Sequence, residues 1–596
     1  MANILHLAVL PAAAAAIISM FAGQAGAKKN PPDTIYFNGK IVTVDSHFSI
    51  EQAFAVANGN FVAVGKNAAI RNLAGPNTRL VDLGGTEVLP GLIDAHPHTV
   101  NGHAKQEELF RINLHGVQSV AEIVSRIGEA ARNAAPGDWI VTTAIGEPPD
   151  YFGLPEVLAE RRWPTRSDLD SVSPNNPVYI PSPNKWPYPA IFNSKGLVAL
   201  GVTRDTPDEQ RVILEHDRTG EPTGVIHGLN FYNASSPLYQ KVASIIPRVP
   251  DSIRLVTIRD AVVDDNAVGL TSLYEVHGST AATVKSLKTL ESKGQLNSRF
   301  VVAYEVPTKN TIAEIDKWMN GLQDAKGAGS GTDLLKIVGI NVAVDGATEF
   351  GAALNKKAYL DPYGRVSNGE GEITEQKLIE IARLAAKYNL RLNILAAGSR
   401  ACEMAVEAME AVNHSTPIKD KRWVVSHFQQ PTREEIAKLR EMGVVVQTYS
   451  SVDFSKGAET YVKRFPNQDV WKTVIPLRWY WDAGVPVAQS TDGAHYNTMW
   501  TIWESLVRVD GRTGKSLLTP AKKITREEAI KMYTINGAKV MQWEDRIGSI
   551  EPGKLADFAV LDHDILSVPI NQIRDTKVLM TVLGGRTVYG SLPSSG

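Results

Sequence analysis

The stretch LPGLIDAHPHT, residues 89–99, decides the fold, because an apolar, strand-like run ends here in a cluster of polar side chains. Asp94, His96 and His98 close the run. Two histidines at positions i and i+2 of an extended strand lie on the same face, where their imidazoles can share one metal ion. An isolated H-x-H pair is a weak signal. Its position after an apolar strand, with Pro90-Gly91 just before, favours a metal site.

Downstream of this stretch, strand-like segments alternate with helix-like segments over the long middle of the chain. Helical periodicity is clear at residues 375–388 (EQKLIEIARLAAKY) and 432–442 (TREEIAKLREM). Such alternation predicts parallel strands with right-handed crossovers. The units are too many for a small open sheet, so we predict an α/β fold, a closed (β/α)8 TIM barrel with insertions. The strand candidates are GLIDAHPHT, WIVTTAIG, NPVYIPS, LTSLYEVHG, RFVVAYEV, KIVGINVAV, LRLNILAA, RWVVSHF, VVVQTYS and VPVAQSTDG.

Both ends of the chain contain short strands. In TIYFNGKIVTVD (34–45) and AFAVANGNFVAVG (53–65), Asn-Gly dipeptides break apolar runs and favour two-residue hairpins. Residues 555–590 return to strands, with a Gly-Gly turn in VLMTVLGGRTVYG. We therefore predict that both ends build one small β-sandwich flanking the barrel. The predicted domains are a sandwich of residues 28–90 and 541–596 and a metal-dependent barrel of residues 91–540.

Composition excludes several classes of protein. Because 62 Lys and Arg balance 64 Asp and Glu, the net charge is −2, and nothing favours nucleic acid or an anionic membrane as partner. With 43% hydrophobic and 21% charged residues, the chain is typical of a globular protein rather than a disordered one. The single cysteine, Cys402, excludes an intramolecular disulfide and a cysteine-based zinc module.

Residues 1–27 are predicted to be a signal peptide. The apolar run LAVLPAAAAAIISMFA, residues 7–22, is shorter than the about 20 residues that a membrane span needs. Ala25-Gly26-Ala27 follows it as an A-x-A cleavage pattern. We expect cleavage after Ala27 and a mature chain that is secreted or periplasmic and free of the membrane. The alternative is an uncleaved membrane anchor.

Several phrases together resemble one family. LPGLIDAHPH resembles the first metal motif of the amidohydrolase superfamily, and IGSIEPGKLADFAVLD resembles its closing β-sandwich. FNGKIVTVD, GEPTGVI, VDGATEFGAAL, RWVVSHFQQPT and STDGA resemble the YtcJ-like branch, amidohydrolase family 3. The resemblance covers nearly all of residues 34–590. It implies a TIM barrel with a sandwich and metal-assisted hydrolysis of C–N bonds, mostly amides.

His427 and Asp492 extend the candidate site, since each ends a predicted strand. The resemblance implies that His427 is the family's sixth-strand histidine and Asp492 its eighth-strand aspartate, which binds metal and acts as general base. Chemistry agrees, because a metal lowers the pKa of bound water toward about 7 and a neighbouring carboxylate can take its proton. The alternatives are a structural barrel histidine and a helix N-cap.

The chain departs from the family pattern at the metal site. Asn341 replaces the fourth-strand lysine that can carry a carboxylate between two metals, and Lys336 is five residues too early. In LNILAAGSR, Leu395 and Ser399 replace the fifth-strand histidine and aspartate. Before NSK-L, Tyr188 replaces another active-site histidine.

These losses leave too few ligands for two closely spaced ions. His96, His98 and Asp492 remain as a set that can bind one divalent ion, Zn²⁺ or Fe²⁺, with open positions for water or substrate. His427 is then a fourth ligand or a proton donor, so we predict His96, His98, Asp492 and His427 as metal residues and Asp492 and His427 as catalytic. Asn341 or Asn393 is a further candidate oxygen ligand.

Other polar residues are candidates for the same cavity. Glu275 and His277, at i and i+2, offer replacement ligands or an acid–base pair, although a polar rim packed on loops explains them as well. Tyr188, His227 and Asp345 are the predicted substrate-binding residues, while His495 fits a surface loop. The tryptophans of residues 471–503 fit core packing first and an aromatic pocket second.

The function predicted from the sequence is therefore hydrolysis of an amide-type C–N bond in a small molecule. Metal-activated water attacks, and Asp492 is the general base. The lost ligands keep two alternatives open: a repurposed lyase, hydratase or isomerase, and a binding protein without catalysis. A small-molecule substrate is the expected partner, and the family suggests a homo-oligomer.

Overall fold

The computed structural model describes residues 30–592 except 101–109, 149–150, 152, 184–187, 210, 231–232, 234–235 and 494–496. The predicted signal peptide with its cleavage site after Ala27, and His495, lie outside these residues. Within the described part, none of the helices has both the length and the apolar composition that crossing a membrane requires.

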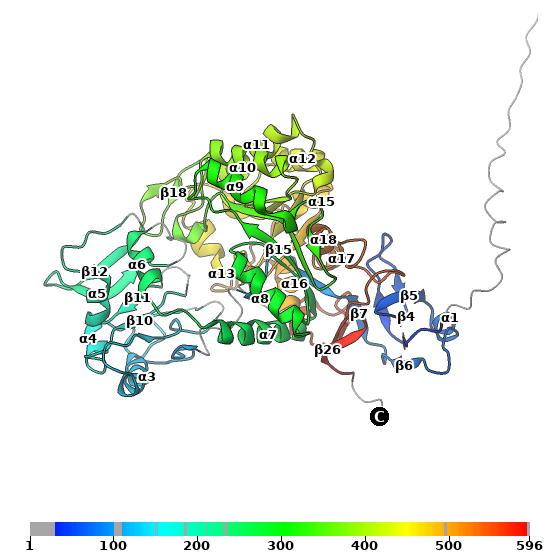
Figure 1. The fold of residues 1–596 in the computed structure, drawn as a ribbon, viewed down its shortest axis with the longest axis horizontal. Coiled ribbons are helices and arrows are strands. Elements are labelled where there is room, and N and C mark those ends of the chain that lie inside the picture. The colour runs from blue at the N-terminus through cyan, green and yellow to red at the C-terminus, as the bar shows by residue number, and fades with distance from the viewer. Residues whose placement is uncertain are drawn as a thin grey trace, which may run out of the picture.

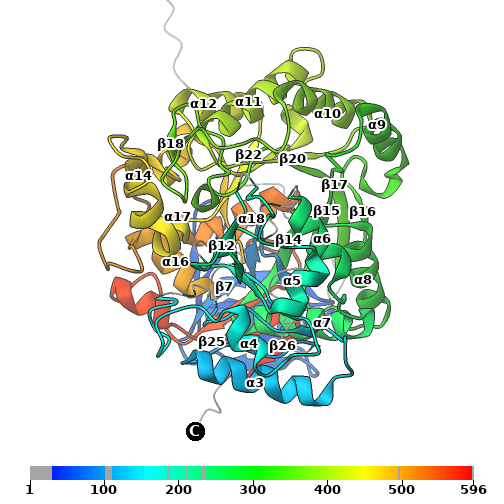
Figure 2. The same ribbon diagram turned by 90° about the vertical axis from the view of Figure 1, so that its left-hand side faces the viewer.

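The middle of the molecule is a parallel barrel whose strands follow one another in chain order (Figures 1 and 2). Neighbouring strands pair in parallel. The first and last strands are joined by the Ala95 N–H, which donates to the Gln489 carbonyl at 3.2 Å. The predicted (β/α)8 class is thus confirmed. The strands are β8 (Leu92–Asp94), β14 (Leu270–Glu275), β15 (Arg299–Glu305), β17 (Leu335–Ala343), β20 (Leu392–Ala396), β21 (Val424–His427), β22 (Val445–Thr448) and β23 (Val487–Gln489).

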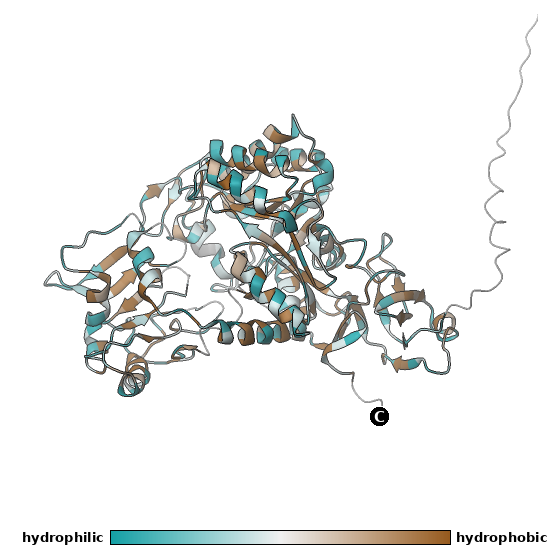
Figure 3. Cartoon of the chain, viewed as in Figure 1, coloured by the Kyte–Doolittle hydropathy of each residue, from teal (hydrophilic) through white to brown (hydrophobic). Residues whose placement is uncertain are grey.

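Amphipathic helices cover the outside of the barrel, with apolar strands inside and polar outer helix faces (Figure 3). Leu378, Ile381, Ala382 and Ala385 form the buried face of α10, whose first turn is capped by Thr374. The predicted helices at 375–388 and 432–442 are confirmed as α10 and α12. The helices are α7 (Asp251–Ala267), α8 (Ala281–Ser292), α9 (Ile312–Gly321), α10 (Glu375–Lys387), α11 (Ser399–Asn413), α12 (Arg433–Glu441), α13 (Val452–Gly457), α14 (Val470–Thr473), α15 (Leu477–Ala483), α16 (Thr498–Val507), α17 (Arg526–Met532) and α18 (Ile535–Met541).

Two sheets built from both chain ends flank the barrel. In the larger sheet, C-terminal β24 pairs antiparallel with N-terminal β7. The rings of Tyr36, Phe54, Phe61 and Phe558 pack between the sheets, with centroids 5.0–6.3 Å apart. The smaller sheet has the order β5 (Asn60–Gly65), β4 (Ala53–Ala57), β1 (Thr34–Phe37), β6 (Arg79–Asp82). The larger has the order β26 (Arg586–Gly590), β25 (Val578–Leu583), β24 (Phe558–Leu561), β7 (Glu87–Pro90), β2 (Lys40–Val42), β3 (Ile50–Glu51).

The Asn-Gly dipeptides have different roles. Asn58-Gly59 forms the predicted two-residue hairpin between β4 and β5, as does the Gly-Gly turn between β25 and β26. The predicted hairpin at Asn38-Gly39 is wrong, because β1 and β2 belong to different sheets. Asn38 has a positive φ of 58°, and the dipeptide carries the chain from one sheet to the other.

Gly91 makes the junction between sandwich and barrel. A Cβ atom there would lie 2.2 Å from the Thr271 hydroxyl and 3.0 Å from Asp557 Cβ, so only glycine fits. Asp557 also forms a buried bidentate pair with Arg299 of β15, at 2.6 and 2.8 Å. The metal-binding stretch therefore begins at a point where the two domains are tightly joined.

A separate sheet is inserted between β8 and β14 (left in Figure 1). WIVTTAIG and NPVYIPS, both barrel-strand candidates in the sequence, lie in this sheet instead, as β9 and β10. Here β10 pairs antiparallel with β11, which a barrel strand would not do. The sheet order is β12 (Ile213–His216), β13 (Pro222–His227), β11 (Ala190–Phe192), β10 (Val178–Ile180), β9 (Ile140–Val141), with helices α3 (Val120–Asn133), α4 (Arg166–Asp170), α5 (Ser194–Leu200) and α6 (Pro237–Ile245).

The remaining elements are short. They are α1 (Asn67–Arg71), β16 (Ser330–Gly331), β18 (Tyr359–Leu360), β19 (Val366–Ser367), the π-helical turn Ala458–Val462 and the 3-10 turns Gln323–Ala325, Thr348–Phe350, Lys419–Lys421 and Ile570–Asp575.

Candidate metal centre

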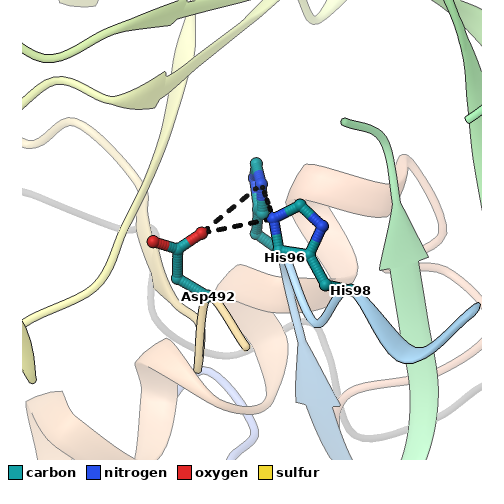
Figure 4. A group of neighbouring side chains, drawn as sticks. All are labelled: His96, His98 and Asp492. Atoms are coloured by element: carbon teal, nitrogen blue, oxygen red, sulfur yellow. Dashed lines mark hydrogen bonds and ion pairs between the residues drawn. The ribbon is translucent and has the colours of Figure 1, made fainter. Parts of the chain in front are cut away.

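Three side chains meet at one point, although they follow the first and the last strand of the barrel. His96 and His98 follow β8, and Asp492 follows β23. The His96 and His98 Nε2 atoms lie 3.1 Å apart and 3.7 and 3.4 Å from Asp492 Oδ1 (Figure 4). One ligand atom from each residue lies within 4.8 Å of the others, a spacing that suits a shared divalent ion. The sequence had predicted these three as metal ligands.

His427, the last residue of β21, joins this group. Its Nε2 lies 3.7 Å from Asp492 Oδ1, and its ring centroid is 5.2 Å from that of His96. The Nε2 atom is buried and has no hydrogen-bond partner among the described residues. Burial lowers the pKa of His427 to about 4, so the ring is neutral and offers a lone pair. An unpartnered buried nitrogen beside a carboxylate fits a metal ligand better than a structural histidine.

The hydrogen-bond partners of His96 determine which of its ring nitrogens can bind a metal. Its Nδ1 lies 3.1 Å from Gln447 Oε1, and Gln447 in turn donates to the Ser490 hydroxyl at 2.6 Å. Because the amide oxygen only accepts, Nδ1 carries the hydrogen and Nε2 has the free lone pair. Asp94 accepts from the His96 N–H at 2.9 Å and from the Thr491 hydroxyl at 2.6 Å, which ties the two ligand loops together.

The electrostatics of the group keep Asp492 ionised. Burial alone would raise the pKa of its carboxyl, but His427, His98 and His96 outweigh burial and hold the pKa below its ordinary range. Burial and the neighbouring imidazoles lower the pKa of His96 well below its ordinary value. The group therefore offers one carboxylate together with the neutral imidazoles of His96 and His427, and these donors fit a borderline divalent ion such as Zn²⁺.

A chain of hydrogen bonds occupies the family's lysine position. Asn341 Nδ2 donates to Glu305 Oε2 at 2.7 Å, Asn341 Oδ1 accepts from Asn393, and Asn393 Oδ1 accepts from the Ser426 hydroxyl at 2.9 Å. Both amide oxygens are thus already used within the chain, so neither is a free oxygen ligand. Lys336 is not part of this hydrogen-bond chain; its Nζ lies over the Trp543 ring, 5.4 Å from the ring centroid.

Leu395 and Ser399 lie where the family has a histidine and an aspartate. Leu395 in β20 is buried and supplies no ligand atom. The Ser399 hydroxyl donates to Asn355 at 3.3 Å, in a loop contact at the start of α11. The fifth strand therefore contributes nothing to the metal centre through these two residues.

Glu275 and His277, which the sequence offered as replacement ligands, an acid–base pair or a polar rim, have different partners in the structure. Glu275 is 1% exposed, and its Oε2 accepts from the Thr99 N–H at 3.1 Å, which holds the loop after His98. His277 instead pairs with Glu305, with Nδ1 3.2 Å from Oε2. Glu305 was missed in the sequence. Its signal is its place at the end of β15, where it is paired in register with Asn341.

Of the predicted substrate-binding residues, Tyr188 and His227 belong to the inserted sheet and the segment leading to it, and Asp345 follows the barrel strand β17. Tyr188 is 3% exposed, in the segment leading to β11, and its hydroxyl donates to the Tyr151 carbonyl. His227 ends β13, with its Nε2 3.6 Å from Glu215. The Asp345 carboxylate accepts from the N–H groups of Leu354, Ala397 and Gly398, each at 2.8 Å. It is therefore committed to holding two barrel loops together.

Tyr449 is a further group that sequence reasoning missed. It follows β22, and its ring centroid lies 5.0 Å from that of His427. Burial, and next the charge of Asp492, raise its pKa well above the ordinary value, so the phenol keeps its proton. Lys456 Nζ lies 3.4 Å from the phenol oxygen and forms an ion pair with Glu349.

The tryptophans Trp500 and Trp503 pack on each other, as expected for core residues.

Comparison with known proteins defines the class. The model of the amidohydrolase family matches residues 79–589. The chain belongs to this family, as its resemblance implied, and is a hydrolase.

The relatives span nearly the whole chain. The N-substituted formamide deformylase of Arthrobacter pascens is 26% identical over 94% of this chain and 98% of its own. The amidohydrolase YtcJ of Bacillus subtilis is 24% identical over 93% and 99%. A metal-dependent hydrolase from Pyrococcus furiosus has a TM-score of 0.67 and 20% identity, covering 90% of this chain and 100% of that one. A zinc and atraton complex of an Arthrobacter aurescens atrazine chlorohydrolase has a TM-score of 0.50 and 15% identity, over 94% and 97%.

Proposed function

We propose that the protein hydrolyses an amide-type C–N bond in a small molecule, using one divalent ion. His96, His98 and Asp492 would hold the ion, and His427 would be the fourth ligand. The observation that carries the proposal is the convergence of these side chains with Nε2 of His427 buried and unpartnered. With these four ligands, an ion that expands to five-coordinate keeps one position for water or substrate.

The chain's own residues have separate tasks in this reaction. A bound divalent ion supplies Lewis-acid chemistry, activating water and polarising a carbonyl. The ionised Asp492 carboxylate accepts the proton of the attacking water, for which its low pKa keeps it ready at neutral pH. The phenol of Tyr449, which stays protonated beside Asp492, is a donor for the developing negative charge on the carbonyl oxygen.

N-substituted amides of small acids, formamides first, are the substrate class that we propose. The likeness to a deformylase of N-substituted formamides extends over almost the whole of both chains, which supports an amide with a substituent on nitrogen. Zinc is the ion that we propose, on the donor set of imidazoles and carboxylate. The zinc complex of the structurally similar atrazine chlorohydrolase supports this choice.

The function is tested with zinc-loaded protein that begins at Lys28. Formanilide and acetanilide are the probes, and released aniline is measured by chromatography. We expect turnover by the wild type and a fall of about 10²–10⁴-fold in kcat for Asp492→Asn, since that variant removes the proton acceptor but keeps the side-chain shape. An unchanged rate for Asp492→Asn, or no release of aniline by the wild type, would contradict the proposal.

A further inference from the structure

An imidazole–carboxylate pair lies beside the candidate metal centre. His277 follows β14, and Glu305 ends the neighbouring strand β15. Nδ1 of His277 lies 3.2 Å from Glu305 Oε2. The same oxygen accepts from the Gly278 N–H at 2.9 Å and from Asn341 Nδ2 at 2.7 Å. Glu305 is thus held in place by the loop after β14 and by the neighbouring strand β17.

These contacts determine which nitrogen of His277 is free. A carboxylate oxygen that receives donors from Gly278 and Asn341 is an acceptor, so Nδ1 of His277 is the hydrogen-bearing donor toward it. Nε2 has no hydrogen-bond partner among the residues that the structure describes. The side chain is 28% exposed, so this nitrogen is accessible to a bound molecule.

His277 and Asp492 flank the metal-binding histidines from opposite sides. In the barrel order, β8 with His96 and His98 lies between β23 and β14. The His277 ring centroid lies 6.0 Å from that of His96 and 5.8 Å from that of His98. A substrate carbonyl held between these histidines therefore has one proton-exchanging group on each side.

We propose that His277 is a further catalytic residue, which gives the proton from its Nε2 to the leaving nitrogen, and that Glu305 is its positioning residue. The assignment rests on the proposed hydrolysis. In this assignment, the two proton transfers of the hydrolysis are carried out by two different residues. Asp492 accepts a proton from water, and His277 donates one to the amine. A carboxylate that orients an imidazole whose other nitrogen faces the reaction is a recurrent arrangement for such transfers.

The step balances without any further reactant. The water oxygen forms a bond to the carbonyl carbon as Asp492 takes one proton of the water. The C–N bond then breaks and the nitrogen keeps the electron pair. His277, which enters the step as an imidazolium with a hydrogen on each nitrogen, gives its Nε2 proton to that nitrogen and becomes neutral. The products are a carboxylic acid and an amine. Solvent returns a proton to Nε2 and takes the proton from Asp492.

The test uses a series of para-substituted formanilides, from 4-methoxy to 4-nitro, with the zinc-loaded wild type and His277→Gln. Glutamine keeps an N–H donor near the position of Nε2 but cannot transfer a proton. We expect kcat to fall about 100-fold or more for 4-methoxyformanilide, whose amine leaves poorly, and less than about 10-fold for 4-nitroformanilide. Glu305→Gln is expected to show the same trend with a smaller fall.

Two further measurements separate the possible outcomes. Zinc content by elemental analysis is expected to be equal in the wild type and His277→Gln. The matched control is His563→Gln, which alters an exposed histidine that also pairs with a carboxylate, and it should follow the wild type throughout. An equal fall for all leaving groups, or loss of zinc in His277→Gln, would overturn the assignment alone. No turnover of the series by the wild type would overturn the proposed function and this assignment with it.

Discussion

His98, His427 and Asp492 share an unusual backbone conformation. Their φ angles are 56°, 65° and 51°, in the left-handed region that non-glycine residues rarely occupy. His427 is the last residue of a barrel strand, and His98 and Asp492 lie in the loops after two others, where the chain turns and the three side chains meet. Such conformations cost on the order of 1–3 kcal/mol each and persist where the surrounding structure imposes them. Three of them at one point are typical of a functional site.

His427 provides a prediction that separates a ligand from a structural histidine. In His427→Gln we expect bound zinc to dissociate at least about 10-fold more readily, because one ligand is lost. The metal-free protein should lose less than about 1 kcal/mol of stability, since the removed nitrogen has no partner in the described part of the chain. Competition with a chromophoric chelator measures the first effect, and thermal unfolding of metal-free protein measures the second. A large loss of stability with unchanged zinc affinity would contradict the ligand role.

The sequence predicted the convergence of residues but not their partners. His96 and His98 could be found from an H-x-H pattern after an apolar strand. His427 and Asp492 needed the family resemblance in addition to their places at strand ends, which meet on one face of a barrel. Glu305 was missed, because its place at a strand end was its only signal and no family motif marked it as well. The pairing of His277 with Glu305 rather than Glu275 depends on the neighbouring strand, which spacing along one strand does not show.

At the scale of the element, β7 carries a buried titratable group in the larger sheet of the sandwich, the carboxyl of Glu87. Glu87 accepts from the Ile565 N–H at 2.9 Å, while its Oε1 lies 3.8 Å from Lys40 Nζ. Burial raises the pKa of Glu87 to about 8. The folded state therefore holds this proton more tightly than the unfolded state does, so stability from this group is full at low pH and is lost as the pH rises toward 8.

Glu87→Gln should remove this pH dependence. One pKa unit corresponds to about 1.4 kcal/mol, so between pH 5 and pH 8 we expect the variant to gain on the order of 3 kcal/mol relative to the wild type. Denaturant midpoints of both proteins at the two pH values measure the difference. The result that opposes this account is a wild type that gains on the variant as the pH rises.

The sequence pattern alone was enough to predict some helices but not to assign some strands to their sheets. α10 and α12 were predictable because a cap and apolar residues at helical spacing agree. The strands of the insertion were taken for barrel strands, because a short apolar run looks alike in any sheet. Asn38-Gly39 and Asn58-Gly59 have the same sequence but different roles, which are decided by the partners of the flanking strands.

At the scale of the whole molecule, the N-terminus carries an untested prediction about location. We propose that the mature protein begins at Lys28 and is secreted or periplasmic. N-terminal sequencing of the protein from its native host should give Lys28-Lys29-Asn30, and cell fractionation should find it outside the cytoplasm. An intact Met1 in purified protein would contradict the cleavage.

The whole fold brings segments hundreds of residues apart into one centre, and we propose that this centre binds one ion. Asn341 and Leu395 remove the ligands of a second ion, and the hydrogen-bond chain from Glu305 to Ser426 occupies the lysine position. The claim of a single ion is the centre of this account, since the substrate position and both proton transfers depend on it.

Zinc content per chain, measured by elemental analysis of purified mature protein, tests this claim most directly. The account predicts about one equivalent in the wild type and little or none in His96→Asn. Two equivalents would contradict it, as would a metal-free wild type that remains active.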